Sequence, residues 1–98
     1  MRSVLDEKVD LLFSRLKMLK SSYNINKIGF FGSITRNDFT EKSDIDIVVE
    51  LGEPIGFFKF MELERYLSDL LGYKVDLVTD QAIKPAVRES IFKDVVYV

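Results

Sequence analysis

The sequence predicts a small α/β fold in which helices pack on a single sheet. Apolar residues recur every three or four positions in some segments and every second position in others, and the two periods alternate along the chain. Strands that alternate with helices are typical of a layered α/β domain. The 98 residues, of which 47% are hydrophobic and 31% charged, suffice for one core. We therefore expect one domain over residues 1–98.

The first segment, residues 3–22, predicts one amphipathic helix. Ser3 stands where an N-cap residue is expected. The apolar side chains form one stripe at spacings of three and four: Leu5, Val9, Leu12, Leu16, Leu19 and Tyr23. Val4, Leu11 and Met18 lie off this stripe, so they either cover a flank of the core or form part of a partner surface.

Seven further elements follow this helix. The clearest strand is residues 44–51, where apolar and polar side chains alternate, so one of its faces looks onto solvent or a site. The helix over residues 56–71 is expected to end at Gly72 and to pack through Phe57, Phe60, Leu63, Leu67 and Leu70. The other elements are a strand over 26–31, a helical turn over 33–38 capped by Ser33, a strand over 74–79, a helical segment over 80–92 interrupted by Pro85, and a strand over 95–98.

The composition excludes several kinds of chemistry. The chain has no Cys and no His, which removes disulfides, zinc fingers, and catalysis by a thiol or an imidazole. A metal site would have to use oxygen ligands, which suit Mg²⁺, Mn²⁺ or Ca²⁺. The net charge of -2 argues against direct nucleic-acid binding. A charged N-terminus and the lack of a long apolar stretch predict a cytoplasmic protein without membrane contact.

Two acidic residues share one face of the strand over residues 44–51. Asp44 and Asp46 are two positions apart, so their side chains project from the same face. Neighbouring carboxylates repel each other unless a cation lies between them. Asp is depleted in strands, which makes a metal site a better interpretation than two exposed acids at a strand edge.

A second feature lies upstream, at Gly32-Ser33. Glycine lets a ligand approach the backbone closely, and the free N–H groups of the following turn would bind an anion. Taken alone, Ser33 reads as an ordinary helix cap. Ten residues separate this pair from Asp44, however, and each feature stands at the end of a strand. Together they predict a phosphate site beside a site for the Mg²⁺ ions that bridge nucleotide phosphates.

These motifs resemble a known superfamily. Gly32-Ser33 followed by Asp44-Ile45-Asp46 is similar to the signature of the DNA polymerase beta-like nucleotidyltransferases. The stretches 30–38 and 43–49 look like its minimal nucleotidyltransferase (MNT) subfamily, and 71–78 looks like that subfamily's third-carboxylate strand. The resemblance covers roughly residues 25–98. It implies a small mixed sheet of about four strands with helices packed on it.

The resemblance also implies a metal site. In the family three acids hold two divalent ions, Mg²⁺ or Mn²⁺, and Asp44 and Asp46 match the first two of these acids. Asp76 is the best match to the third, which lies beside the acceptor hydroxyl. Glu50 is about two residues too far along its strand, and Asp80 reads as a helix cap, but both stay open as alternatives. Without His, the hydroxyl proton would go to Asp76 or to water.

Nucleotide-binding residues are implied in the same way. Gly32 and Ser33 would hold the triphosphate of ATP. Arg36 matches an Arg that commonly follows this pair, and would reach a phosphate or brace an Asp, or else be a solvated helix residue. Ser43 is expected to support the turn before the acids. Asn37 stands where the family often has Gly, and Asn also adopts the left-handed conformation.

The resemblance finally implies a function. MNT proteins of this size resemble antitoxins that transfer AMP from ATP to a Tyr hydroxyl of a partner HEPN-domain ribonuclease toxin. A non-catalytic antitoxin that neutralises its partner by binding is the alternative. A small-molecule nucleotidyltransferase is a third possibility and lacks an obvious substrate domain. Several apolar residues lie off the expected core faces of the helices: Val4, Leu11, Met18, Phe58 and Met61. They predict that the protein functions as part of a homo- or hetero-oligomer.

Overall fold

The computed structural model describes residues 2–98, and its elements alternate as the sequence predicts. Four strands form one sheet, and four α-helices and two short 3₁₀ turns connect them. In chain order the elements are α1 (Val4–Ser14), α2 (Leu16–Tyr23), β1 (Ile25–Phe31), η1 (Gly32–Thr35), β2 (Ile45–Leu51), α3 (Phe57–Leu71), β3 (Val75–Thr79), η2 (Asp80–Ala82), α4 (Pro85–Lys93) and β4 (Val96–Tyr97).

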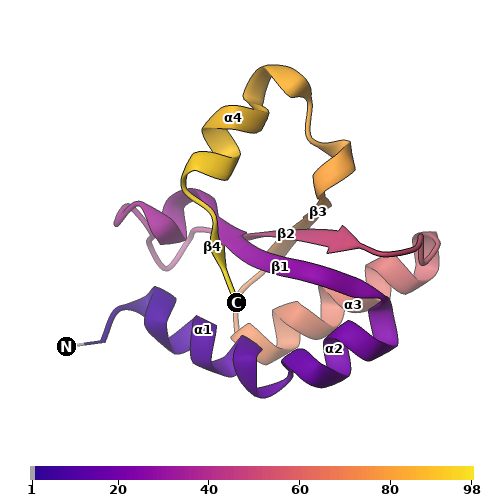
Figure 1. The fold of residues 1–98 in the computed structure, drawn as a ribbon. Coiled ribbons are helices and arrows are strands. Elements are labelled where there is room, and N and C mark those ends of the chain that lie inside the picture. Colours follow the sequence, from indigo (N-terminus) through magenta and orange to yellow (C-terminus); the bar gives the residue numbers. More distant parts are fainter. Residues whose placement is uncertain (1) are drawn as a thin grey trace.

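The sheet is mixed, with the strand order β3-β2-β1-β4. β1 pairs antiparallel with β2 and with β4, whereas β2 and β3 are parallel and are joined through α3. Helices α1, α2 and α3 lie against one face of the sheet, and α4 stands over the other face (Figure 1). This arrangement confirms the predicted mixed α/β fold with a sheet of about four strands.

The first predicted helix is in fact two helices. α1 ends at Ser14, and Arg15 leaves the helical conformation with φ -115° and ψ 4° before α2 begins. The Ser14 hydroxyl donates a 2.6 Å hydrogen bond to the carbonyl of Leu11, a local bond of the kind that bends helices. The apolar stripe continues across the break, since Leu12 and Leu19 are both fully buried. The prediction of one helix over 3–22 was therefore wrong at this residue.

The core lies between the sheet and the three helices below it. Its fully buried side chains include Leu12 and Leu19 from the first two helices, Ile28 and Phe30 from β1, Ile45, Ile47 and Val49 from β2, and Leu63 and Leu67 from α3. Burial of one such aliphatic side chain contributes about 1.5–3 kcal/mol. These side chains fix β1 and β2 as a rigid frame.

One residue of the predicted core face of α3 is not in the core. Phe57 is the first residue of the helix and is 71% exposed. Its ring instead meets that of Phe58 edge to face, with 5.6 Å between the ring centroids. The buried residues of α3 begin at Leu63, so the first turn extends past the core and the helical period alone misplaces Phe57.

The opposite face of the sheet carries the polar side chains. On β2 the alternation predicted from sequence is present, with Asp46 and Glu50 partly exposed on this face. Val48 lies between them, borders the space beneath α4 and is 2% exposed. Helix α4 starts at Pro85, as predicted, and has no buried residue of its own. Within residues 2–98, no helix is long and apolar enough to cross a bilayer.

Candidate active site

Strand register brings two of the predicted acids together. Asp46 on β2 and Asp76 on β3 are paired across the parallel ladder, and paired residues of neighbouring strands project from the same face. Asp44 directly precedes β2 and lies two positions from Asp46. Glu50 stands four positions further along, and Asp80 opens η2, where it pairs with Arg88. Of the three candidates for the third acid, Asp76 is the one placed beside Asp46.

The environment of Asp46 disfavours its negative charge. Burial is the largest cause of the raised pKa of this carboxyl, and the charges of Asp76 and Asp44 raise the pKa further. The positive charge of Arg36 acts in the opposite direction. A cation bound among these carboxylates would therefore stabilise the ionised form of Asp46.

The donor set suits a hard divalent cation. Asp44, Asp46 and Asp76 offer only carboxylate oxygens, the ligands that Mg²⁺ and Mn²⁺ prefer. Within residues 2–98, no three His, Cys, Asp or Glu side chains are already arranged as a metal cage. Mg²⁺ commonly takes only one or two protein carboxylates and completes its shell with water and substrate phosphates.

Gly32 is required at its position for two reasons. Its φ of +77° is one that side chains rarely adopt, and a Cβ placed there would lie 2.2 Å from Oδ2 of Asp46. Phe31, the residue before it, is the β1 partner of Asp46. From the sequence, Gly32 was expected to let a phosphate approach the backbone closely. The structure adds a second reason, because the Asp46 carboxylate occupies the space that a side chain at position 32 would need.

Ser33 is not the helix cap that was predicted. The turn is a 3₁₀ helix that begins one residue earlier, at Gly32, with extended Phe31 at its N-cap position. In the part of the chain that the structure describes, no side chain caps this turn, and the Thr35 hydroxyl instead donates to the Gly32 carbonyl at 2.8 Å. Because the turn forms without a cap, capping does not explain the half-buried Ser33.

Arg36 ends the turn and is half exposed. Its Nε lies 3.8 Å from Oδ2 of Asp38, and its charge reaches Asp46 strongly enough to oppose the rise in pKa. Asn37 follows with φ 64°, which confirms that Asn takes the left-handed conformation here. The guanidinium thus acts on Asp46 through its charge and, among the described residues, makes no ion pair with Asp44, Asp46 or Asp76.

Ser43 supports the loop that leads to the acids. Its hydroxyl accepts a 2.9 Å hydrogen bond from the backbone amide of Thr40, and its own amide donates to the Thr40 carbonyl at 3.0 Å. These two bonds close the turn immediately before Asp44. The predicted supporting role of Ser43 is confirmed.

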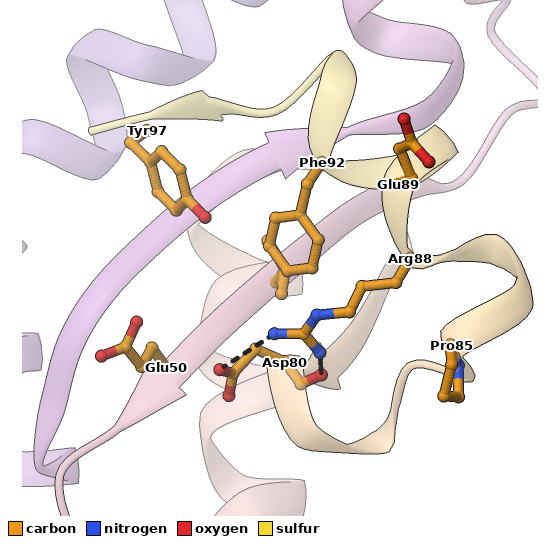
Figure 2. Close-up of a pocket in the computed structure, with 8 residues that line it drawn as sticks. Glu50, Asp80, Pro85, Arg88, Glu89, Phe92 and Tyr97 are labelled. Carbon is orange, nitrogen blue, oxygen red and sulfur yellow. Dashed lines mark hydrogen bonds and ion pairs between the residues drawn. The ribbon is translucent and has the colours of Figure 1, made fainter.

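Sequence reasoning missed a cavity on the same face. It lies between α4 and the strands and has a volume of about 540 Å³ (Figure 2). Its lining comes from β2, η2, α4 and β4: Val48, Glu50, Asp80, Pro85, Arg88, Glu89, Phe92 and Tyr97. The one signal in the sequence was Glu50, which alternates with the core residues of β2 on the same face as Asp46.

The mixed sheet, the glycine turn and the neighbouring aspartates together indicate an enzyme that transfers nucleotides. Residues 14–98 match the family described as the nucleotidyltransferase domain, and the chain belongs to that family. The matched region contains every element from α2 onward and all the acids discussed above.

Curated relatives cover nearly the whole chain. The Methanocaldococcus jannaschii protein MJ0128, provisionally named a protein adenylyltransferase, is 53% identical over 95 residues, which are 96% of this chain and 97% of its own. The protein adenylyltransferase MntA of Thermococcus cleftensis is 39% identical over 94 residues, which are 96% of this chain and 95% of its own.

Solved structures share the fold at lower identity. A structure described provisionally as a minimal nucleotidyltransferase has a TM-score of 0.77 and 23% identity, covering 97% of this chain and 95% of that one. A chain from the complex of tri-AMPylated Shewanella oneidensis HEPN toxin with an MNT antitoxin has a TM-score of 0.66 and 21% identity, and the match covers 92% of this chain and 70% of that one. Both agree with the mixed sheet described above.

Proposed function

We propose that this chain is a protein adenylyltransferase that moves AMP from ATP to a Tyr hydroxyl of a HEPN-type ribonuclease toxin, and so acts as its antitoxin in the cytoplasm. The observation that carries the proposal is the register that sets Asp76 beside Asp46, next to the turn at Gly32. The relatives named protein adenylyltransferases and the AMPylated HEPN–MNT complex with the same fold support the transfer of AMP and the kind of partner.

The proposed chemistry is an in-line displacement at the α-phosphorus of ATP. The acceptor oxygen forms a bond to that phosphorus, the bond to the β-phosphate oxygen breaks, and pyrophosphate leaves. Divalent ions, when bound, would supply charge stabilisation of the phosphates. Gly32 and Ser33 would hold the triphosphate, and Asp44 and Asp46 would hold the divalent ions. Since the chain has no His, the hydroxyl proton would go to Asp76 or to water.

The decisive experiment is intact-mass analysis of a HEPN-type partner after incubation with this chain, ATP and Mg²⁺. The partner should gain one or more AMP units, and peptide mapping should place them on Tyr. Omitting Mg²⁺ or substituting Asp46→Asn should prevent the gain. If wild-type enzyme leaves the partner unmodified while still suppressing its ribonuclease activity, transfer of AMP is not the mechanism.

That last outcome defines the second candidate function, a binding module without chemistry. It is favoured by the apolar side chains that the fold leaves on its surface, among which Phe58 is 86% exposed and Met61 is 50% exposed. Monomers rarely display such groups together unless they meet a partner. The intact site acids favour the enzyme, because a purely covering antitoxin has no use for them.

A further inference from the structure

Asp44 is held less directly than the other two acids of the site. Asp46 and Asp76 lie within paired strands, whereas Asp44 is the last residue of the loop over residues 36–44 that follows η1. Its side chain is exposed, and among the described residues its carboxylate makes no ion pair and no hydrogen bond. The position of this carboxylate therefore depends on the backbone that leads to it.

Phe39 anchors the middle of that loop to the body of the protein. Its side chain is partly buried and packs against the core, although no helix or strand contains it. Its ring meets that of Tyr73 edge to face, with 5.1 Å between the ring centroids. Tyr73 stands in the turn between α3 and β3, and Nζ of Lys8 on α1 lies 5.1 Å from the centroid of its ring. The aromatic pair thus joins the loop to the segment that leads into β3 and Asp76.

Hydrogen bonds connect Phe39 to Asp44 on one side. Phe39 is followed by Thr40, whose amide and carbonyl bond to Ser43 at 2.9 and 3.0 Å, and whose hydroxyl lies 3.2 Å from that of Ser43. Ser43 directly precedes Asp44. Because three contacts close this turn, a displacement of Phe39 is transmitted to the backbone at Asp44.

A backbone hydrogen bond connects Asp44 to Tyr73 on the other side. Ile45, the residue after Asp44, donates its amide to the carbonyl of Lys74 at 2.9 Å, and Lys74 directly follows Tyr73. The contact between the rings of Phe39 and Tyr73 therefore closes a chain of contacts around Asp44. Beyond the area that it buries, an aromatic pair contributes a factor of about 2 to 13 to a local equilibrium.

Filling of the core does not fully explain Phe39. The ring is only partly buried, and it borders a cavity of about 220 Å³ that lies between the start of α1 and the turn η1. A side chain that merely filled the core would be enclosed on all sides, as Phe30 is. The contact with the ring of Tyr73 explains the placement of Phe39 better.

We infer that Phe39 is a positioning residue of the transfer reaction, because its contact with Tyr73 fixes the backbone at Asp44. The carboxylate of Asp44 is thereby held at the start of β2, two positions from Asp46. This inference rests on the proposed function, which assigns Asp44 to the divalent ions. It gives a role to a loop residue that lies outside the glycine–serine and aspartate motifs.

The test compares Phe39→Ala with Phe60→Ala, its matched control. Both phenylalanines are partly buried and pack against the same core, so both variants should unfold at a lower temperature than the wild type. In Phe39→Ala alone, hydrogen exchange of the Ile45 amide, followed by NMR, should become about 2- to 13-fold faster, the factor that the aromatic pair supplies. The affinity for Mn²⁺, followed by EPR without nucleotide, should fall about 10-fold or more in Phe39→Ala, as it does when the support of a metal ligand is removed.

Two variants of Tyr73 guard against misfolding of Phe39→Ala. Tyr73→Leu removes the partner ring and should reproduce both effects, whereas Tyr73→Phe keeps the ring and should behave as the wild type. Transfer of AMP to a HEPN-type partner should fall in parallel with the affinity for Mn²⁺.

The outcomes separate this inference from the proposed function. If either the Ile45 exchange rate or the Mn²⁺ affinity of Phe39→Ala equals that of Phe60→Ala, the inference is wrong while the proposed function stands. If the wild type neither binds Mn²⁺ nor modifies a HEPN-type partner, the proposed function fails and the inference fails with it.

Discussion

Replacing Gly32 with alanine tests the contact between the glycine turn and the Asp46 carboxylate. Two separate penalties are expected. The first is backbone strain, because a φ of +77° costs an L-residue about 1–2 kcal/mol. The second is the clash of the new Cβ with Oδ2 of Asp46, 2.2 Å away, which can be relieved only by moving the carboxylate. Holding that side chain off its rotamer costs about 0.5–1.5 kcal/mol more.

The chain contains a matched control for this substitution. Gly72 at the end of α3 has φ +75°, and a Cβ added there would meet nothing within 4 Å. Gly72→Ala therefore carries the strain without the clash. In thermal unfolding, a loss of 1 kcal/mol lowers the Tm of a domain of this size by about 4–8 °C. We expect Gly72→Ala to lose about 1–2 kcal/mol and Gly32→Ala to lose more.

Activity should separate the two variants more sharply than stability does. Because a displacement of about 1 Å in an active site can cost about 100-fold in rate, Gly32→Ala should transfer AMP at about a hundredth of the wild-type rate or less. Gly72→Ala should transfer at nearly the wild-type rate, measured below the Tm of both variants by the mass of the modified partner. Equal rates for the two variants would refute the argument that Gly32 leaves room for Asp46.

Three further predictions concern the acids, the turn and the surface. Asp46→Asn should reduce transfer by about 10³-fold or more. The pKa of Asp46 is raised in the folded state, so the free energy of unfolding of the wild type without Mg²⁺ should fall as the pH rises through the titration range of this carboxyl. The free energy of unfolding of the Asn variant should fall less. Identical pH profiles of the two proteins in chemical denaturation would contradict this. Ser33→Ala should change the free energy of unfolding by less than about 0.5 kcal/mol, since no cap is lost. The same substitution should lower the affinity for ATP measured by titration, and an unchanged affinity would leave Ser33 without a role at the phosphates. Met18→Gln and Phe58→Gln should weaken association with the partner in sedimentation while leaving the Tm nearly unchanged, whereas a Tm lower by several degrees with normal association would make them structural residues.

The order of the elements was predictable because hydrophobic period reports directly on burial. The closeness of Gly32 and Asp46 was also predictable, since both belong to one spaced signature, and in the structure a Cβ at Gly32 would lie 2.2 Å from Oδ2 of Asp46. The break at Arg15 was not predictable, because the spacing of the apolar stripe runs unbroken through the residue at which the backbone leaves the helical conformation. Phe57 has the right spacing for the core and lies one turn beyond it.

The cavity was hidden from sequence reasoning for a different physical reason. Helix α4 buries none of its residues, so its pattern carries no record of the face it stands over. The position of the helix depends on a tertiary ion pair between Arg88 and Asp80 and on the short strand β4 that follows it. The pairing of β4 with β1 joins distant segments, and the contact of Arg88 with Asp80 spans eight positions, so neither follows from a hydrophobic period.

The pairing of Asp46 with Asp76 ties assembly of the site to correct folding. The two residues are 30 positions apart in the sequence, and only the alignment of β2 with β3 brings them side by side. A slip of one residue would turn Asp76 into the core and bring Val75 and Leu77, both buried, out into water. Burial of Val75 and Leu77 therefore favours the one strand alignment that also pairs the two aspartates. Misaligned copies of the enzyme should unfold rather than persist as inactive protein.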